Sequence, residues 1–239
     1  QVDPLNSDQV SDAILKSDSD LVFAFSWSWR IPSSVVKQKI CLCLHPSNLP
    51  SYAGGTPIQN QVFDGLYDSK VSVFKMTNKL DYGPIYMQCA LSLFGGIEEV
   101  FERITSIGRS ISEQVISDYV ANKLKFKEIS TIPEHPEHYS KIRGPADSQL
   151  YLNDLKTISF NFLTQKIKIL LNPYPNAFIS VGDNIIKLKS IKRIKKVKPD
   201  YILLSENIEY DVKIETKCVL ILEDGYALIS DFELLKAQN

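Results

Sequence analysis

The chain has 239 residues, enough for one large domain or two small ones around a buried core. Apolar residues make up 44% of it, which excludes a disordered chain, and the net charge of −1 argues against a nucleic-acid-binding protein. No apolar run approaches the ~20 residues of a membrane-spanning helix, and residues 1–20 are polar and acidic rather than a signal peptide, so we expect a cytoplasmic protein without a membrane segment.

Strands alternate with helices in the first half of the chain. A short helix, capped by Asn6 or Ser7, carries apolar residues on one face. Two continuous apolar runs, Leu21–Phe25 and Lys39–Cys43, are typical of strands buried on both faces of a parallel sheet. After them the pattern predicts a short helix from Pro57 to before Gly65, strands over Val71–Lys75 and Ile85–Leu93, and a long amphipathic helix from Ile97 to Tyr119. This alternation predicts an α/β fold with a shortened, Rossmann-like sheet in residues 1–128.

The second half differs from the first in residue composition and in its pattern of apolar residues. Residues 129–148 are rich in Pro, His, Glu and Gly without periodicity, which indicates a linker. Residues 149–239 are expected to form a small antiparallel β-rich domain, with turns at Asp183–Asn184 and Asp224–Gly225. Its expected strands are Ile167–Leu171, Phe178–Val181, Ile185–Ile191, Tyr201–Leu204, Val212–Glu215 and Cys218–Leu222.

Two loops carry residues suited to proton transfer. His45 follows the second buried strand, at the edge where open α/β sheets place their ligands, and a loop rich in Pro and Gly comes after it. Asp81 lies in the loop between the next two strands. A carboxylate beside an imidazole fixes its tautomer and supports its charged form. The spacing alone leaves open that either residue is a cap or a solvent-exposed side chain.

The residues around both loops resemble the formyltransferases that use N10-formyltetrahydrofolate. The family pattern is roughly N-x-H-P-S-x-L-P-x-x-R-G-x-x-P, followed by a loop L-D-x-G-x-I. The matching residues are His45, Pro46, Ser47, Leu49, Pro50, Gly54 and Pro57, then Leu80, Asp81, Gly83 and Ile85. Further similar segments are Asp20–Pro32, Tyr139–Arg143 with Asp147–Ser148, and Asn172–Phe178. The resemblance covers about residues 10–190 in the same order.

The resemblance implies an enzyme that moves a formyl group from N10-formyltetrahydrofolate to an amine. The segment Gly54–Asn60 is most similar to sugar N-formyltransferases. The acceptor we expect is therefore a nucleotide-linked amino sugar, a dTDP-linked 4-amino-4,6-dideoxy sugar, whose product enters a surface polysaccharide such as the O-antigen of lipopolysaccharide. No metal is expected, because the protein supplies the acid/base and oxyanion groups.

The resemblance also assigns roles to residues. His45 is the general acid/base and Asp81 orients it, while Cys43 stands where the family has an Asn that hydrogen-bonds the oxyanion. A thiol replaces that donor poorly, so Asn48 or Asn60 is an alternative donor. The folate is expected against Phe25, Trp27, Trp29, Ile31 and Met76, although the two Trp side chains could equally be packing or interface aromatics. Acceptor binding is expected from Asn48, Gly54, Gly55, Gln59 and Asn60.

Two rival functions are open for the same residues. The first is formylation of methionyl-tRNA, which the slight excess of acidic over basic residues disfavours. The second is a catalytically weak paralogue that acts as a binding or assembly subunit, suggested by Cys43 and by Ala53, where the family has Arg or Lys. Two or three β/α units that precede Leu21 in the family are absent from the sequence. We therefore expect this strand near a sheet edge that a homodimer covers.

Three further groups have simpler interpretations. Seven Lys and Arg residues fall within residues 187–198. They could bind along a phosphate backbone, but we expect them to form the solvent-exposed face of a hairpin. His135 and His138 have a spacing seen in metal sites, yet no third ligand motif lies nearby and no metal site is expected. The four cysteines lack CxxC spacing and are expected as reduced thiols, with Cys41 and Cys43 buried and inert.

Overall fold

A computed structural model of the chain describes residues 7–25, 27, 31–128, 140–205, 213 and 215–236. The chain divides into two compact units. The first contains Gln1–Gln61, Leu66–Leu93 and Val100–Ile142, and the second contains Val62–Gly65, Phe94–Glu99 and Arg143–Asn239. The domain boundaries expected from the sequence, after residues 128 and 148, stay a prediction.

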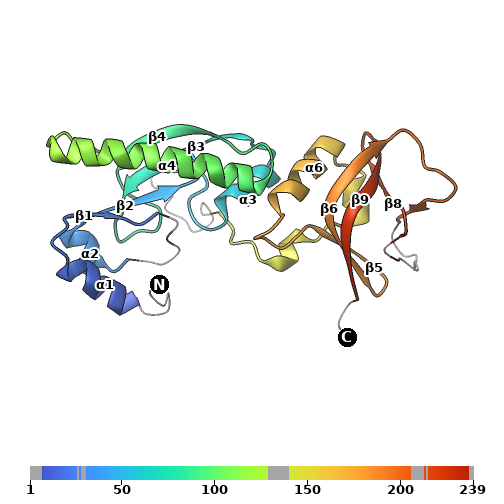
Figure 1. Ribbon diagram of the computed structural model, residues 1–239, viewed down its shortest axis with the longest axis horizontal. Coiled ribbons are helices and arrows are strands. Elements are labelled where there is room, and N and C mark those ends of the chain that lie inside the picture. Colours follow the sequence, from blue (N-terminus) through green and yellow to red (C-terminus); the bar gives the residue numbers. More distant parts are fainter. Residues whose placement is uncertain are drawn as a thin grey trace. The chain divides into compact units, whose positions relative to one another are not determined.

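The first unit is built on a four-stranded mixed sheet (Figure 1). The strands are β1 (Leu21–Phe23), β2 (Ile40–His45), β3 (Asp68–Lys75) and β4 (Ile85–Ser92), in that spatial order. Strands β1 and β2 are parallel, whereas β2–β3 and β3–β4 are antiparallel. The expectation of a parallel sheet thus holds only for the first pair, because β3 and β4 are joined by a loop of nine residues rather than by a crossover helix.

Helices cover both faces of this sheet (Figure 1). Cys41 of β2 packs with Val35 in the cluster reached by α1 (Ser7–Lys16) and α2 (Ser33–Gln38), while its neighbour Leu42 packs with Ile111 of α4 (Ile97–Val120). Successive residues of a strand point to opposite faces, so the apolar run in β2 serves two cores. The remaining helix, α3 (Pro57–Phe63), comes after the loop that leaves β2.

Strand β1 differs from its prediction. The sequence indicated a strand buried on both faces over Leu21–Phe25, but β1 ends at Phe23, which is 36% exposed, and its other two residues are half-buried. Among the described strands it pairs only with β2, so it lies at the edge of the sheet and has one neighbour to cover it. Helix α2 was not predicted, since its six residues are too few for a clear apolar period.

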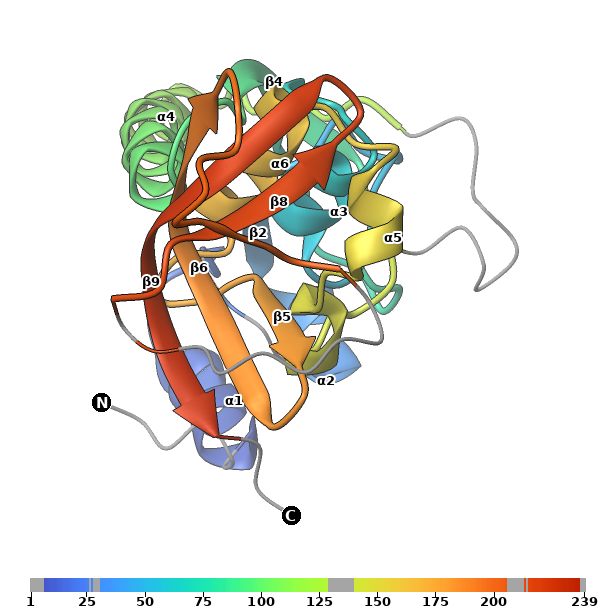
Figure 2. The same cartoon turned by 90° about the vertical axis from the view of Figure 1, so that its right-hand side faces the viewer.

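The second unit contains a five-stranded sheet (Figure 2). Its strands are β5 (Phe178–Val181), β6 (Asn184–Ile194), β7 (Ile202–Leu203), β8 (Cys218–Leu222) and β9 (Gly225–Lys236), in the spatial order β5-β6-β9-β8-β7. All neighbours are antiparallel except β7 and β8. Before the sheet come the 3-10 helix η2 (Pro145–Ser148), α5 (Leu152–Leu155) and α6 (Phe160–Ile169), and α6 packs against β6 and β9.

Two predictions for this unit need correction. The strand expected over Ile167–Leu171 is wrong, because Ile167 and Ile169 belong to helix α6. Ser159 caps that helix, accepting a hydrogen bond from the Phe162 amide at 3.3 Å. Strand β9, the longest of the sheet, was not predicted. The strand expected over Val212–Glu215 includes two positions, 212 and 214, outside the described residues, and Glu215 lies in a turn.

Candidate functional site

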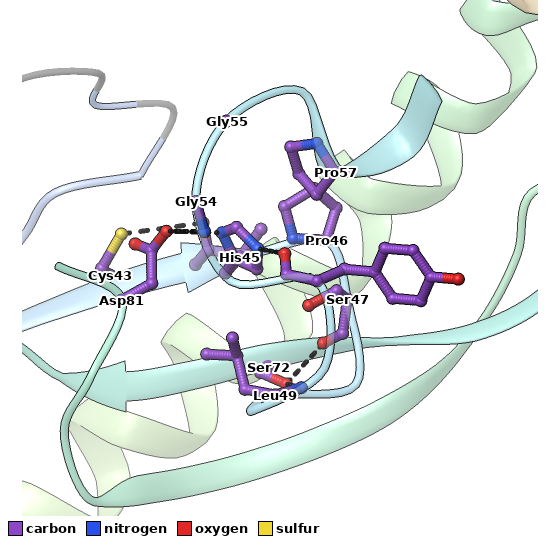
Figure 3. A network of polar contacts seen from close by, with 12 residues as sticks. Cys43, His45, Pro46, Ser47, Leu49, Gly54, Gly55, Pro57, Ser72 and Asp81 are labelled. Carbon is purple, nitrogen blue, oxygen red and sulfur yellow. Dashed lines mark hydrogen bonds and ion pairs between the residues drawn. The ribbon is translucent and has the colours of Figure 1, made fainter. Parts of the chain in front are cut away.

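His45 and Asp81 lie together in the first unit (Figure 3). His45 is the last residue of β2, and Asp81 belongs to the loop between β3 and β4. The distance from His45 Nδ1 to Asp81 Oδ2 is 3.6 Å, and both side chains are largely buried. A carboxylate and an imidazole this close, with little water around them, can share and move a proton.

The loop after β2 contacts both members of the pair. His45 Nε2 donates a hydrogen bond to the Tyr52 carbonyl oxygen at 2.8 Å, and the Gly54 amide donates one to Asp81 Oδ2 at 2.8 Å. The backbone φ angle is positive at Tyr52 (57°), Gly54 (98°) and Asp81 (46°). For a residue other than glycine the left-handed region costs about 1–2 kcal/mol, and such strain gathers at functional sites.

A buried serine of β3 and a half-buried glutamine of β4 hold the start of the same loop. Ser72 stands opposite His45 in the β2–β3 pairing and donates a hydrogen bond to the Ser47 carbonyl at 2.6 Å. Its hydroxyl accepts from the Leu49 amide at 3.2 Å and from Gln88 Nε2 at 2.8 Å. Ser72 and Gln88 were not predicted from the sequence. The one signal for Ser72 is a serine inside an otherwise apolar buried strand.

Cys43 lies two residues before His45 and is buried. Burial, and second the Asp81 carboxylate, raise the pKa of the Cys43 thiol to about 12. Its Sγ donates a weak hydrogen bond to the Leu44 carbonyl at 3.7 Å. The thiol is therefore neutral at physiological pH, and the structure agrees with the expectation of a buried, inert cysteine.

Three of the side chains expected at the folate site gather in one cluster. Ile31 is buried with Ala24, Val35 and Cys41, and Trp27 and Met76 pack against this group. Phe25 instead packs with Leu42 in the core beneath α4. Trp29 lies outside the described residues, as do His135 and His138.

The residues expected to bind the acceptor fall into different environments. Asn48 is exposed, whereas Gln59 and Asn60 are buried in α3. Asn60 Nδ2 donates hydrogen bonds to the carbonyls of Gly55 at 3.1 Å and Lys141 at 2.8 Å, so its amide holds backbone rather than facing the His45–Asp81 pair. Gln59 Nε2 is buried without a hydrogen-bond partner among the described residues.

Gly55 approaches another part of the unit closely. A Cβ atom at Gly55 would lie 2.4 Å from a side-chain carbon of Ile142, so only glycine fits there without movement. Its neighbour Gly54 contributes the amide that Asp81 accepts from. Within the described ranges, no helix is long and apolar enough to cross a membrane, and no three His, Cys, Asp or Glu side chains gather as a metal site.

Comparison with known proteins shows which family the sequence resembles. Residues 3–120 match the formyl transferase family. The match covers just under half of the chain. Methionyl-tRNA formyltransferase of Rickettsia typhi is 26% identical to this chain over 190 residues, which cover 77% of this chain. The chain spans 59% of the length of that relative. A methionyl-tRNA formyltransferase of Finegoldia magna is 26% identical over 239 residues, covering 96% of this chain and 71% of the relative.

Several solved structures share the fold. Methionyl-tRNA formyltransferase from Clostridium thermocellum has a TM-score of 0.64 at 21% identity, covering 91% of this chain and 78% of that one. HypX from Aquifex aeolicus in complex with tetrahydrofolic acid has a TM-score of 0.68 at 16% identity, with 99% and 40% covered. A sugar N-formyltransferase from Shewanella sp. has a TM-score of 0.52 at 17% identity, with 75% and 71% covered.

Proposed function

We propose that the chain carries the catalytic site of an N-formyltransferase. The observation that supports this best is the His45–Asp81 pair, in which the last residue of β2 and the loop between β3 and β4 come to 3.6 Å. An amine attacks a formyl group only after it loses a proton, and the amine that leaves must gain one. A buried imidazole with a carboxylate beside it is suited to both transfers near neutral pH.

The roles of the residues follow from their positions. His45 takes the proton from the acceptor amine and returns it to the leaving nitrogen, and Asp81 stabilises the charged imidazole between these steps. Cys43 offers only a weak donor, and that donor is directed to the Leu44 carbonyl. The proposal therefore assigns no oxyanion hydrogen bond to the Cys43 side chain.

We propose N10-formyltetrahydrofolate as the donor, which supplies the formyl group. The half-buried Trp27 and Met76, packed beside Ile31, offer the apolar surface that a flat ring system needs. The HypX structure that shares this fold contains tetrahydrofolic acid. Phe25, which packs under α4, is a weaker candidate for the same surface.

For the acceptor we propose a primary amine on a nucleotide-linked sugar, as the sequence of the Gly54–Asn60 segment suggests. A dTDP-linked 4-amino-4,6-dideoxy sugar is the first compound to test, with its product entering surface polysaccharide. The sugar N-formyltransferase from Shewanella sp. shares the fold over 75% of this chain. A homodimer is part of this proposal, and β1, which has one strand neighbour in the described sheet, offers an edge for it.

Methionyl-tRNA is a second candidate acceptor, which two observations favour. The Finegoldia magna methionyl-tRNA formyltransferase aligns with 96% of this chain, so the similarity extends through the second unit. That unit also contains the basic stretch from β6 to residue 198, where Lys189, Lys192, Lys195 and Lys196 are exposed. Exposed cations of this kind attract phosphates, and their contribution to binding weakens as salt rises.

The test is a formyl-transfer assay with N10-formyltetrahydrofolate and a panel of acceptors. The panel contains dTDP- and UDP-linked amino sugars and methionyl-tRNA, each at low and high salt. His45→Ala and Asp81→Asn should each lower the rate of the accepted substrate by about 10²–10⁴-fold. Unchanged turnover in both variants would contradict the proposed site, and transfer to methionyl-tRNA alone would overturn the sugar acceptor.

Cys43→Asn tests the missing oxyanion donor in the same assay. A carboxamide at this position adds an N–H donor that the thiol lacks, so we expect the rate to rise by about tenfold or more. Cys43→Ser is the matched control, because it replaces the thiol with a hydroxyl of similar size and provides no carboxamide. If no acceptor is formylated by the parent or by Cys43→Asn, the chain serves as a binding subunit and the proposed function fails.

A further inference from the structure

The three residues Tyr52, Ala53 and Gly54 form a short backbone segment that touches both members of the His45–Asp81 pair. The Tyr52 carbonyl contacts His45 Nε2 at 2.8 Å, and the Gly54 amide contacts Asp81 Oδ2 at 2.8 Å. Between them, the Ala53 carbonyl accepts a hydrogen bond from the Ser140 amide at 2.6 Å. We call Tyr52–Gly54 the backbone clip. It fixes an imidazole at the end of β2 and a carboxylate from the loop between β3 and β4.

The clip determines which imidazole nitrogen carries a permanent proton. A backbone carbonyl can only accept a hydrogen bond, so Nε2 facing the Tyr52 carbonyl must be protonated in both the neutral and the charged ring. The nitrogen that gains and loses a proton is then Nδ1, which lies 3.6 Å from Asp81 Oδ2. Figure 3 shows the imidazole of His45 beside Asp81 and Gly54, with a dashed line for its hydrogen bond to the loop that follows β2.

The clip depends on an uncommon backbone conformation. Tyr52 has a φ of 57° and Gly54 one of 98°, and both values lie in the left-handed region. In the described part of the chain, Tyr52, Thr56, Asp81 and Asn122 are the residues other than glycine with positive φ, and three of these four belong to the loops of this site. If Tyr52 returned to an ordinary φ, the direction of its carbonyl would change and His45 Nε2 would lose its acceptor.

We propose that Tyr52 is a positioning residue, whose left-handed backbone holds His45 as the Nε2–H tautomer and leaves Nδ1, beside Asp81, as the nitrogen that moves the proton. The kinetic part of this proposal rests on the proposed formyl transfer. The part that concerns the tautomer rests only on the hydrogen bonds of the clip.

A matched pair of substitutions separates backbone conformation from side-chain contacts. Tyr52→Asn and Tyr52→Val both remove the aromatic ring, but Asn adopts the left-handed region readily and the β-branched Val does not. In ¹⁵N-histidine spectra of the full chain, with His45 identified by its loss in His45→Gln, the parent and Tyr52→Asn should show a protonated Nε2 and an unprotonated Nδ1. Tyr52→Val should show a mixture of the two tautomers.

The kinetic measurement uses the same pair. Relative to Tyr52→Asn, Tyr52→Val should lose about 10²-fold in kcat, with KM changed by less than about threefold, because the pair is misplaced while the binding surfaces are intact. Asn122→Val places the same strain at an exposed turn after α4 and should leave the tautomer unchanged.

The proposal would be overturned by a parent protein with the proton on Nδ1, or by Tyr52→Asn and Tyr52→Val variants with the same tautomer. Because the spectra need no turnover, they remain informative if no acceptor is found. In that case the proposed function fails while the assignment of the tautomer is still decided. Loss of tautomer control in Asn122→Val as well would show a general effect of strain and would also reject the role of Tyr52.

Discussion

Cys43 shows how one buried side chain links the site to the stability of the fold. It lies two residues before His45 in β2, and its side chain packs with Leu49, Ala53 and Phe74 in the apolar core. The two causes that raise its pKa, burial and the Asp81 carboxylate, both disfavour the thiolate. The folded chain therefore resists the loss of this proton much more than the unfolded chain does.

This difference predicts a loss of stability at high pH. The pKa of Cys43 rises from its ordinary value of 9.0 to about 12 on folding. Below pH 9 both states keep the proton, whereas between about pH 9 and 12 only the folded state keeps it, so the free energy of unfolding falls as the pH rises. Each pH unit in this window costs about 1.4 kcal/mol for this thiol. Urea denaturation at pH values from 8 to about 10.5 measures the slope.

Cys43→Ala should make that slope shallower, although its cavity lowers stability at every pH. Cys89→Ala, at a half-buried thiol of β4, controls for the loss of a cysteine as such. Cys218, whose pKa burial raises to about 11, adds to the slope from the second unit. Equal slopes in the parent and Cys43→Ala would contradict the raised pKa.

At the scale of residues, sequence reasoning reached the charged pair but not the groups that hold it. His45 and Asp81 could be named because each comes shortly after a predicted strand, and because the segments around them resemble a known family. Their roles stay a prediction. Ser72 and the Tyr52 carbonyl could not be named, since the first depends on which strand pairs with β2 and the second on a backbone angle. Neither leaves a period or a motif in the sequence.

At the scale of elements, α6 shows why a short window misleads. Ile167, Ile169 and Leu171 alternate with Lys166, Lys168 and Leu170, and this partly one-sided pattern predicted a strand. A longer window includes Leu163, four residues before Ile167, and the capping Ser159, and both favour a helix. Strand β9 was missed because Asp231 and Glu233 interrupt its apolar pattern. By contrast, α4 has a period sustained over 24 residues and was predicted correctly.

Helix α6 also carries a buried polar side chain whose removal should lower the free energy of unfolding. Gln165, which is 3% exposed, accepts a hydrogen bond from the Gly95 amide at 3.1 Å and donates one to the Gly95 carbonyl at 2.7 Å. Gln165→Ala leaves both backbone groups buried without these partners, so we expect the free energy of unfolding to fall by about 2–4 kcal/mol. Urea denaturation measures the change.

Lys168→Ala is the control for this prediction. It lies on the same helix, three residues further on, and its side chain is exposed, so the change should stay within about 0.5 kcal/mol. A loss in Gln165→Ala no larger than that in Lys168→Ala would mean that water replaces the glutamine amide at no cost.

At the scale of the complete chain, neither compact unit corresponds to one continuous range of the sequence. The second unit includes Val62–Gly65 and Phe94–Glu99, which lie far from Arg143–Asn239 in the sequence. Within this unit the ring of Phe63 lies 4.4 Å from Arg143 Cζ and 4.4 Å from Lys166 Nζ. A change in composition can indicate a linker, but it cannot show that short distant segments complete a core, because such contacts have no local pattern.

The second unit should therefore be less stable when it is produced as residues 143–239 alone. The fragment lacks Gly95 and Phe63, so the amide of Gln165 and the cations beside the ring lose partners that they have in the full chain. Burial, and second the charge of Arg143, lower the pKa of Lys166, and removing the ring exposes this amine to water. We expect faster hydrogen exchange in β6 and β9 of the fragment than in the full chain.

Gln165→Ala connects the two measurements. In the full chain it should speed exchange in the second unit, because the Gly95 contacts are lost. In the fragment, where Gly95 is already absent, the same substitution should change little, since a partner cannot be lost twice. Equal effects in both backgrounds would mean that Gln165 acts through α6 alone. The segment Phe94–Glu99 would then be a neighbour of the second unit in space without contributing to its stability.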